Sequence, residues 1–396
     1  YSGATAGHGG LSTSFFNPAV LSEQDGMAMS GNFAIVDGTA RFHDGQASTV
    51  FGTPITGSDG NNLIEPGYVP AGYLSYELDP ELTLGLAITA PYGFTTTEEP
   101  GWIGRYHALT SKVQSVDINP MVSYAPTDWI SFGAGFRAMY FKARLSNAID
   151  FGTIGASASV PGAVPGSYAQ DGSVDLEGDD WAFGYTLGVL FEPQDGTKFG
   201  IGYRSRMHVN VTGEADFQTG GPVGTTIAGV TGQFQDTGGQ AEITLPDTIS
   251  FGASHDVDDK LTLSAQAAFT RWSSFDELIV QFDNPAQADN LTVEDWSDSW
   301  FVSVGGSYDV TDQLQLRLGG AFDQSASRKA EDRTPRIPDS NRWWLSTGAG
   351  YELMPGMELN VAYTRIFAPS NTTDLHATDP GNTVRGNLYG RWDSHA

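Results

Sequence analysis

The chain has 396 residues, of which 49 are glycine and 12% are aromatic. It has no cysteine, which excludes disulfides, thiolate metal sites and a cysteine nucleophile. Its 47 acidic and 20 basic residues give a formal net charge of -27. A field of that sign repels phosphate backbones, so we expect no nucleic-acid partner. No stretch approaches the ~18 apolar residues of a membrane-spanning helix. This composition favours an all-β protein and leaves open whether its solvent is water or lipid.

The first 25 residues lack regular alternation and are rich in Gly, Ser and Ala. They contain Asn17-Pro18-Ala19, in which proline fixes φ and asparagine suits a tight turn. This motif is either an ordinary turn or helix start, or part of a plug. The large apolar residues Phe15, Phe16, Val20 and Leu21 favour a compact plug over a disordered leader. We therefore predict an N-terminal plug at 1–25 and a β-barrel at 26–396.

Alternation of apolar and polar residues with period 2 runs through the rest of the chain and predicts strands. Residues 130–140 are an example, with Phe132 and Phe136 on one face and Ser131 and Arg137 on the other. Thirteen strands are predicted in this way. They cover residues 26–36, 68–78, 82–92, 110–125, 129–145, 180–192, 197–213, 243–256, 260–272, 297–309, 313–324, 341–353 and 357–367.

Short and long connections between these strands alternate without exception. The short ones are rich in Pro, Asp and Gly, as turns are, at 78–81, 125–128, 193–196, 257–259, 310–312 and 354–356. The long ones span 37–67, 93–109, 146–179, 214–242, 273–296 and 325–340, with another from 368. Short periplasmic turns and long external loops are typical of an up-and-down barrel in an outer membrane. A closed ladder pairs every backbone group, so a chain of modest hydropathy can span a bilayer.

Bacterial single-chain barrels have even strand numbers, whereas thirteen is odd. Residues 386–396 have the pattern of an opening fourteenth strand. We expect the natural chain to continue past Ala396 by about one strand; the alternative is a miscounted strand.

Pro91 lies inside the predicted strand 82–92. Proline cannot donate to a ladder and is confined to strand edges, first positions and bulges, and a closed barrel has no edges. Either the strand ends at Ala90, or it breaks away from its neighbour around Pro91.

Two of the long loops carry apolar side chains that are costly on a water-facing surface. They are Ile149, Phe151, Ile154, Val160, Val164 and Tyr168 in loop 146–179, and Phe217, Val223, Ile227, Val230 and Phe234 in loop 214–242. These side chains pack a small loop core or form an apolar groove that captures amphiphiles, and the two interpretations are compatible. Apolar area leaving water, at about 25 cal/mol per Å², would drive such capture.

Two further sets of residues have two interpretations each. Arg137 and Arg317 fall at inward positions, where they pair with carboxylates inside the barrel or meet the carboxylate of a ligand. Five tryptophans fall near predicted strand ends, as an aromatic girdle requires, although some could line the groove instead. They are Trp272, Trp296, Trp300, Trp343 and Trp344.

Motifs of catalysis and metal binding are missing from the sequence. The seven histidines form no HExxH, and neither GxSxG nor a P-loop occurs. We therefore expect no enzyme, no cofactor and no metal. An acidic cluster at Asp171, Asp175, Glu177, Asp179 and Asp180 lacks EF-hand spacing. Calcium binding there stays open, with a solvated acidic loop facing lipopolysaccharide as the favoured interpretation.

Four segments resemble the FadL-type outer-membrane transporters of long-chain fatty acids and other hydrophobic compounds. The first is Tyr1-Ser2-Gly3 with Asn17-Pro18-Ala19. The second is Ala90-Pro91-Tyr92-Gly93-Phe94 with Trp102, Gly104-Arg105-Tyr106 and Asn119-Pro120. The third is Thr244-Leu245-Pro246-Asp247 with Trp272-Ser273, and the fourth runs from Arg336 to Ser346.

The resemblance implies a transmembrane, antiparallel, 14-stranded barrel with an N-terminal plug. It also implies a third strand that kinks inward and opens a lateral exit in the wall. Ala90, Pro91, Tyr92 and Gly93 match that kink, and Gly67 is expected to face the gap. Family members extend beyond both ends of this sequence, so part of the plug is expected to lie before Tyr1.

Together these observations predict a passive, monomeric uptake channel in a bacterial outer membrane, in contact with lipid and lipopolysaccharide. Its ligand would be a long-chain fatty acid or a similar hydrophobic molecule, captured outside and released through the wall. The alternatives are a water-filled porin for polar solutes, a surface receptor or adhesin without transport, and an outer-membrane hydrolase.

Overall fold

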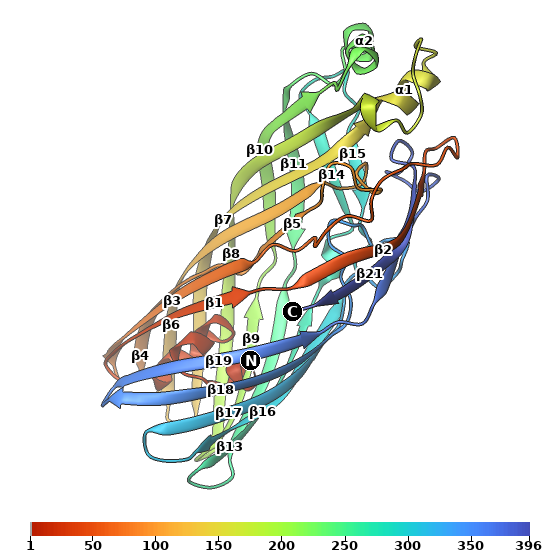
Figure 1. Cartoon of the computed structure of the whole chain (residues 1–396). Coiled ribbons are helices and arrows are strands. Elements are labelled where there is room, and N and C mark those ends of the chain that lie inside the picture. Colours follow the sequence, from red (N-terminus) through yellow and green to blue (C-terminus); the bar gives the residue numbers. More distant parts are fainter. Residues whose placement is uncertain (1) are drawn as a thin grey trace.

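The structure is a computed structural model that describes residues 2–396; Tyr1, part of the first resembling segment, lies outside the described residues. Every strand segment belongs to one antiparallel sheet, which curls into a tall barrel (Figure 1). The strands are β1 (Met27–Val36), β2 (Thr39–Ser48), β3 (Gly67–Asp79), β4 (Leu82–Thr89), β5 (Gly93–Thr97), β6 (Thr110–Thr127), β7 (Ile130–Asp150), β8 (Asp171–Gln194), β9 (Thr197–Arg204), β10 (Met207–Gln218), β11 (Thr237–Leu245), β12 (Thr248–Asp256), β13 (Leu261–Thr270), β14 (Glu277–Phe282), β15 (Asn290–Val293), β16 (Ser299–Asp309), β17 (Leu314–Asp323), β18 (Arg342–Met354), β19 (Met357–Phe367), β20 (Asn371–Leu375) and β21 (Asn387–His395).

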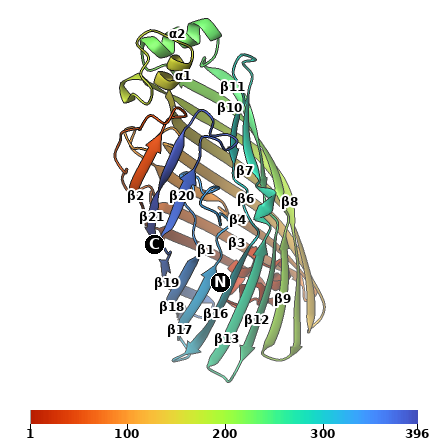
Figure 2. The same ribbon diagram turned by 90° about the vertical axis from the view of Figure 1, so that its right-hand side faces the viewer.

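The helices are short, and none of them is part of the wall of strands. Two α-helices, α1 (Phe151–Ser157) and α2 (Pro222–Thr231), sit together at the end of the barrel opposite the short turns (Figures 1 and 2). The 3-10 helices are η1 (Ala4–Ala6), η2 (Leu11–Phe15), η3 (Pro18–Glu23), η4 (Tyr168–Gln170) and η5 (Trp272–Ser274). No helix of the described chain is long and apolar enough to cross a membrane.

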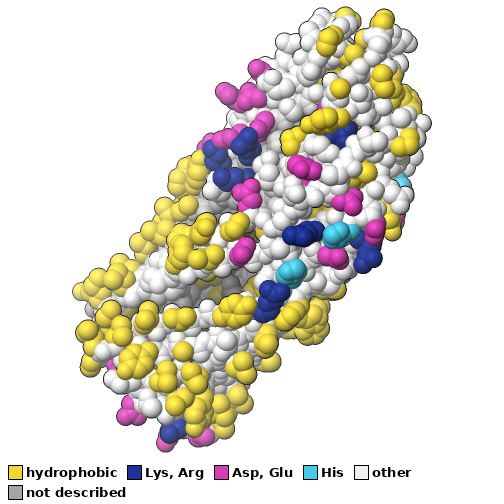
Figure 3. All heavy atoms as spheres, viewed as in Figure 1, with side chains coloured by type: hydrophobic (Ala, Val, Ile, Leu, Met, Phe, Trp, Pro, Cys, Tyr) yellow, Lys and Arg dark blue, Asp and Glu magenta, His cyan; other side chains and the backbone are white. Residues whose placement is uncertain are grey.

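The exposure of the two strand faces is the reverse of that in a water-soluble protein, because apolar side chains are exposed and polar side chains are buried. On β6, Val116 is 46% exposed and Val122 is 39% exposed, whereas Asp117 and Ser123 on the opposite face are fully buried. Figure 3 shows hydrophobic side chains spread over the lower half of the visible face, with most charged side chains above them. An apolar outer band around a polar interior is the pattern of a barrel in lipid.

The predicted class, an antiparallel transmembrane barrel, is confirmed. The predicted loops, in contrast, are too long. Loop 37–67 contains β2, loop 273–296 contains β14 and β15, and the segment after 368 contains β20, whereas β21 agrees with the strand predicted to open at 386–396. The acidic cluster predicted as a loop lies in β8, which begins at Asp171. This part of the prediction is wrong because it relied on apolar alternation, which is lost where strands rise above the lipid.

The pairing of the first and last strands differs along the barrel. β2 pairs with β21, while β19 meets β21 only at Phe367 and His395. β1 pairs with β3 on one side, and within residues 2–396 no pairing joins it to β19. The expected strand beyond Ala396 stays a prediction.

The N-terminal segment, residues 2–25, lies against the inward face of the strands near the short turns (Figure 1). It approaches six inward glycines so closely that a Cβ on any of them would come within 3.0 Å of its atoms. These seat glycines are Gly85, Gly133, Gly188, Gly200, Gly202 and Gly252. The seat depends on glycine because only a residue without a side chain admits another backbone so near.

Candidate functional site

The inward side chains of β6 mark the levels of the barrel interior, from the external loops down to the N-terminal segment. Ser111 accepts a hydrogen bond from Arg336 of an external loop at 3.0 Å. Ser123, at the other end, donates to the Ala19 carbonyl oxygen at 3.0 Å. Twelve residues of strand correspond to about 40 Å. The interior therefore extends over most of the barrel's length, and its features can be placed by their level on β6.

The backbone ladder is interrupted at the middle level, where β4 gives way to β5. β4 pairs with β6 as far as Thr89–Asp117, and pairing resumes at Gly93–Gln114. Ala90, Pro91 and Tyr92 thus stand opposite only two residues of β6. The Tyr92 amide donates to Ser115 Oγ at 2.9 Å, and that hydroxyl donates back to the Tyr92 carbonyl oxygen at 2.6 Å. The chain kinks here and is held by one serine.

The kink leaves a stretch between β3 and β5, here called the gap, in which the backbone ladder is unpaired. β3 pairs with β4 up to Gly72–Ile88, and the chain before β3 rejoins β5 at Glu65–Thr95. Among the described residues no ladder pairing joins 66–71 to 89–94. Pro66, Pro70 and Pro91 lie along this stretch and have no N–H to donate. The predicted residues Gly67, Ala90, Pro91, Tyr92 and Gly93 are all on the rim of the gap.

The interior behind the gap is apolar. Tyr92 packs against a buried group, the lumen cluster, formed by β7, β8, β10 and β11. Its buried members are Met139, Phe141, Ala182, Met207, Val209, Val211 and Leu245. Hydrophobic side chains on the inside of a barrel are unusual where the lumen holds water. They suit a passage for an apolar molecule.

Charged residues form a network directly below the lumen cluster. Asp117 pairs with Arg137 at 2.7 Å and with Arg204 at 3.0 Å. Arg204 also donates to the Phe15 carbonyl oxygen at 3.0 Å and lies over the Phe15 ring. This network links the level of the kink to the N-terminal segment. Arg137 is thus paired with a carboxylate of the barrel, and Arg317 pairs with Glu358.

Asn17 fixes the N-terminal segment to the wall and to itself. Its side-chain amide donates to the Thr5 carbonyl oxygen at 2.8 Å and to the Val189 carbonyl oxygen at 3.0 Å. Its Oδ1 accepts the Ala19 amide at 3.0 Å, so Asn17 also caps η3, in which Pro18 is the first residue. The Asn17-Pro18-Ala19 motif is therefore both a helix start and an anchor to β8.

The apolar residues of the two long loops converge on α1 and α2. Phe151, Val223 and Ile227 are buried together, with Ile149, Ile154, Val160 and Phe234 packed against them. Phe217 joins the neighbouring cluster on β10. Val164 and Tyr168 stay more than half exposed. These contacts describe a small loop core, and a ligand groove beside it stays a prediction.

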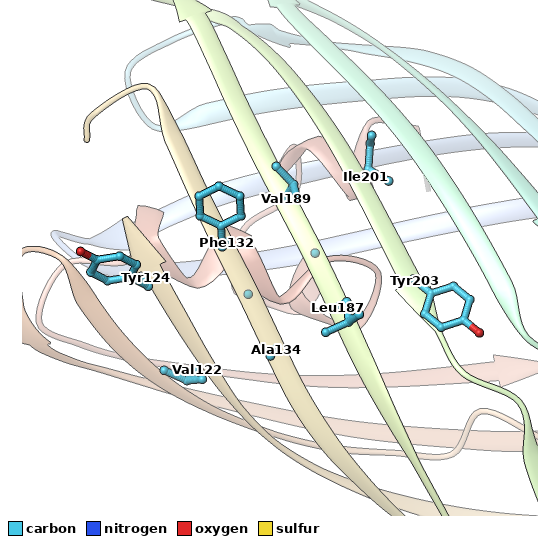
Figure 4. A pocket seen from close by; sticks show the side chains of 10 residues that line it. Val122, Tyr124, Phe132, Ala134, Leu187, Val189, Ile201 and Tyr203 are labelled. Carbon is cyan, nitrogen blue, oxygen red and sulfur yellow. The ribbon is translucent and has the colours of Figure 1, made fainter. Parts of the chain in front are cut away.

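One apolar hollow lies on the outer surface. It has a volume of about 490 Å³ and is lined by Val122, Tyr124, Phe132, Gly133, Ala134, Leu187, Gly188, Val189, Ile201 and Tyr203. Figure 4 shows these side chains projecting from β6–β9. Its apolar residues belong to the exposed band, so the hollow is a depression facing lipid and separate from the lumen.

Several acids of the β8 cluster have cationic partners. Asp171 pairs with Arg105 at 2.6 Å, Asp175 pairs with Arg144 and Glu177 pairs with Lys142. Within residues 2–396 no group of three or more acidic or histidine side chains is arranged to hold a metal ion. The predicted tryptophans occupy two kinds of environment. Trp300 and Trp343 are exposed on the barrel, whereas Trp272 packs against Trp296 in a loop.

Sequence analysis missed the residues that act over long separations. Ser115, Asp117 and Arg204 carry no motif, and Asp117 and Arg204 are 87 positions apart. Only the polar side of the alternation in β6, where Ser115, Asp117 and Asn119 follow one another, marks them as inward.

Comparison with known proteins agrees with this architecture. The sequence matches the family described as outer membrane protein transport protein (OMPP1/FadL/TodX) over residues 1–396. Outer membrane protein P1 of Haemophilus influenzae is 25% identical, over 92% of this chain and 82% of that protein. The long-chain fatty acid transport protein of Escherichia coli K12 is 24% identical, over 89% of this chain and 81% of that protein.

Solved structures give the same result. A Pseudomonas aeruginosa FadL homologue superposes with a TM-score of 0.90 at 25% identity, covering 100% of this chain and 93% of that one. The Pseudomonas putida toluene transporter TodX shares the fold, with a TM-score of 0.66 at 17% identity over 97% of this chain and 91% of that one. The chain belongs to the OMPP1/FadL/TodX family, and it is an outer-membrane β-barrel of a transport family rather than an enzyme.

Proposed function

We propose that the protein is a passive channel that takes up hydrophobic molecules, such as long-chain fatty acids, and releases them sideways through the gap between β3 and β5. The observation that carries this proposal is the interrupted ladder at 66–71 and 89–94, with the apolar lumen cluster directly behind it. A hydrophobic ligand has no reason to enter water below the barrel if the wall offers a route into lipid.

We further propose that residues 1–25 act as the plug beneath this route. Three observations support it: the close seat on the inward glycines, the bonds of Asn17 to Thr5 and Val189, and the contact of Phe15 with Arg204. The Asp117 network joins this segment to the level of the kink. A movement of Phe15 would therefore displace Arg204 and its partner Asp117, which lie near Tyr92. Capture at the outer surface beside α1 and α2, at Val164 and Tyr168, completes the proposed path.

A bulky residue on the rim tests the lateral exit. A Cβ at Gly93 would meet nothing nearer than the Val113 carbonyl oxygen at 3.6 Å, so Gly93→Trp can be tolerated by the fold. We expect this variant to lower uptake of a labelled fatty acid by about tenfold or more in a strain lacking the native protein, since the side chain fills the exit.

The matched control is Gly31→Trp on β1, where a Cβ meets nothing within 4 Å. It adds the same side chain to the barrel away from the gap and should leave uptake unchanged. Both variants should migrate as folded barrels in heat-modifiability gels. Wild-type uptake in folded Gly93→Trp protein would refute the lateral exit.

Conductance in planar bilayers separates this function from that of a porin. The N-terminal segment crosses the interior near the short turns, so we expect only small, infrequent ion currents from the purified protein. Large steady currents would favour a water-filled porin instead.

A further inference from the structure

A second cavity, distinct from the gap and from the lipid-facing hollow, opens among the external loops at the mouth of the barrel. Its volume is about 380 Å³, within the range of small-molecule sites. Its walls come from the segment before β6, from β15, from the loop before β18 and from the loop before β21. They include His107, Thr292, Thr334, Arg336, Leu375 and Arg385.

Arg336 is a buried residue in the wall of this cavity. Its side chain also attaches the loop before β18 to the barrel. Its Nη1 donates to the Thr110 carbonyl oxygen at 3.2 Å and to Ser111 Oγ at 3.0 Å, and its Nη2 donates to Asn147 Oδ1 at 3.4 Å. All of these acceptors are uncharged. The Arg336 side chain is thus held in place, and in the described chain no carboxylate lies within ion-pair distance of it.

Arg385 repeats this arrangement from the other side of the cavity. Its Nη2 donates to Thr292 Oγ1 at 3.1 Å and to Asn290 Oδ1, again both uncharged. Elsewhere the buried Arg105 and Arg137 each pair with an aspartate. In the described chain neither Arg336 nor Arg385 forms an ion pair, although each is more than nine-tenths buried. A buried charge without a partner is costly and unusual in a protein that needs it only for stability.

One buried acid, Glu294, acts on both guanidiniums, and a single carboxylate cannot neutralise two of them. Burial raises the pKa of Glu294 to about 7, although Arg336, the Trp296 indole and Arg385 favour its charged form. Burial and Arg385 lower the pKa of Arg336 to about 9, and burial lowers that of Arg385 to about 10. Both arginines therefore stay protonated at neutral pH, and a single carboxyl group, whose own ionisation is opposed by burial, acts on the two of them.

The remaining acids that line the cavity are Glu331, Asp332 and Asp379. Glu331 is exposed, Asp332 pairs with Lys329 at 3.1 Å, and Asp379 accepts the His376 amide at 2.9 Å. Of these acids Glu331 faces solvent and Asp332 is neutralised by Lys329, so neither is paired with the two buried guanidiniums. An interaction at the buried wall is stronger than one at the solvent side because less water screens it.

Two neutral groups at the buried wall also lack partners. His107 Nε2 and Thr334 Oγ1 are buried and have no hydrogen-bond partner in the described chain, and both residues line the cavity. Burial, with Arg385 and Arg336, lowers the pKa of His107 to about 3, so its ring is neutral and either ring nitrogen can carry the proton. The cavity is thus lined by two guanidinium groups and by two polar groups without hydrogen-bond partners. Groups of this kind can donate hydrogen bonds to an oxyanion.

We propose that Arg336 and Arg385 form an anion site at the mouth, which holds the carboxylate, sulfate or phosphate head of an amphiphilic ligand. The inference rests on the proposed function, since the tail of that ligand is the hydrophobic molecule the channel takes up. Leu375 and Val293 line the same cavity and provide contact for the first carbons of the tail. The site selects amphiphiles by the charge of the head group, and a neutral hydrocarbon gains nothing from it.

Arg385→Gln tests the site, because the Arg385 side chain donates only to two residues of the short strand β15 in the described chain, whereas Arg336 ties its loop to the long strands β6 and β7. Binding of dodecanoate and of 1-dodecanol, which has the same tail without charge, is measured on the purified full chain in neutral detergent by titration calorimetry. We expect Arg385→Gln to weaken dodecanoate binding about tenfold or more, with dodecanol unchanged. Arg385→Lys should recover most of the dodecanoate affinity.

Arg144→Gln is the matched control, since Arg144 is an exposed arginine paired with Asp175 elsewhere on the outer part of the barrel. It should change neither affinity. Dodecyl sulfate should behave as dodecanoate does. Equal weakening of dodecanoate and dodecanol, or no weakening of dodecanoate, would overturn the anion site and leave the proposed function standing. Wild-type protein that binds none of these amphiphiles would overturn both.

Discussion

Single residues decide how closely the N-terminal segment can approach the wall. The seat glycines lack the one atom that would push it away, and Asn17 uses the space to reach the Val189 carbonyl oxygen of β8. Asn17 is fully buried, and its side chain makes three hydrogen bonds to backbone groups. Asn17 thus links two parts of the N-terminal segment to each other and links the segment to β8.

Asn17→Ala should therefore loosen the segment without unfolding the barrel. It removes three hydrogen bonds and leaves the Ala19 amide and the Thr5 carbonyl buried without a partner, which costs roughly 1–3 kcal/mol for each group left unpaired. We expect single-channel currents to become larger and more frequent, and fatty-acid uptake to fall. Asn32→Ala, on the exposed face of β1, is the control. Unchanged currents and uptake in Asn17→Ala would contradict the assigned anchor.

At the scale of elements, β6 joins every functional level of the interior. In order along its inward face, β6 contacts Arg336, then Tyr92, then Arg137 and Arg204 through Asp117, and finally Ala19. The kink is the most sensitive of these contacts, because Ser115 alone pairs the amide and the carbonyl of Tyr92 that the ladder leaves free.

Ser115→Ala should destabilise the kink. The change leaves two backbone groups of Tyr92 without their partner, and we expect a lower apparent unfolding temperature together with altered uptake. Ser303→Ala is a matched control, since Ser303 is also buried on an inward strand face and its hydroxyl has no partner in the described chain. Equal unfolding temperatures for the two variants would show that the serine does not hold the kink.

The elements differ in how far the sequence predicts them. Strands in the lipid band, such as β13 and β17, were predicted to within two residues at each end, because apolar alternation marks them directly. β2 and β20 were missed because their outer faces meet water and carry residues such as Arg41 and Asp374. The rim of the gap was predicted from Pro91 and the family resemblance. The arginines of the mouth were not, since Arg336 finds its partners 189 to 226 positions away.

At the scale of the whole molecule, the apolar band and the unequal ends fix the orientation in the membrane. The short turns lie at one end, and α1, α2 and the polar loops lie at the other (Figure 2). In outer-membrane barrels the long loops face outward and the short turns face the periplasm.

Cysteine labelling on intact cells tests this orientation. The chain has no cysteine, so there is no background. A membrane-impermeant maleimide should label Val230→Cys on α2, where the native side chain is 82% exposed. The same reagent should not label Asp195→Cys in a short turn until the outer membrane is permeabilised. Labelling of Asp195→Cys on intact cells would require the opposite orientation.

Three residues of the β4–β5 connection stand opposite two residues of β6. The interruption of the ladder therefore depends on one additional amino acid in the connection. Loss of a single codon among 90–92 would equalise the two stretches and bring β5 back into line with β4, beside the free part of β3. A continuous ladder and an interrupted one are therefore separated by one deletion, and sequence lengths at this point offer a way to sort relatives of the protein into the two kinds.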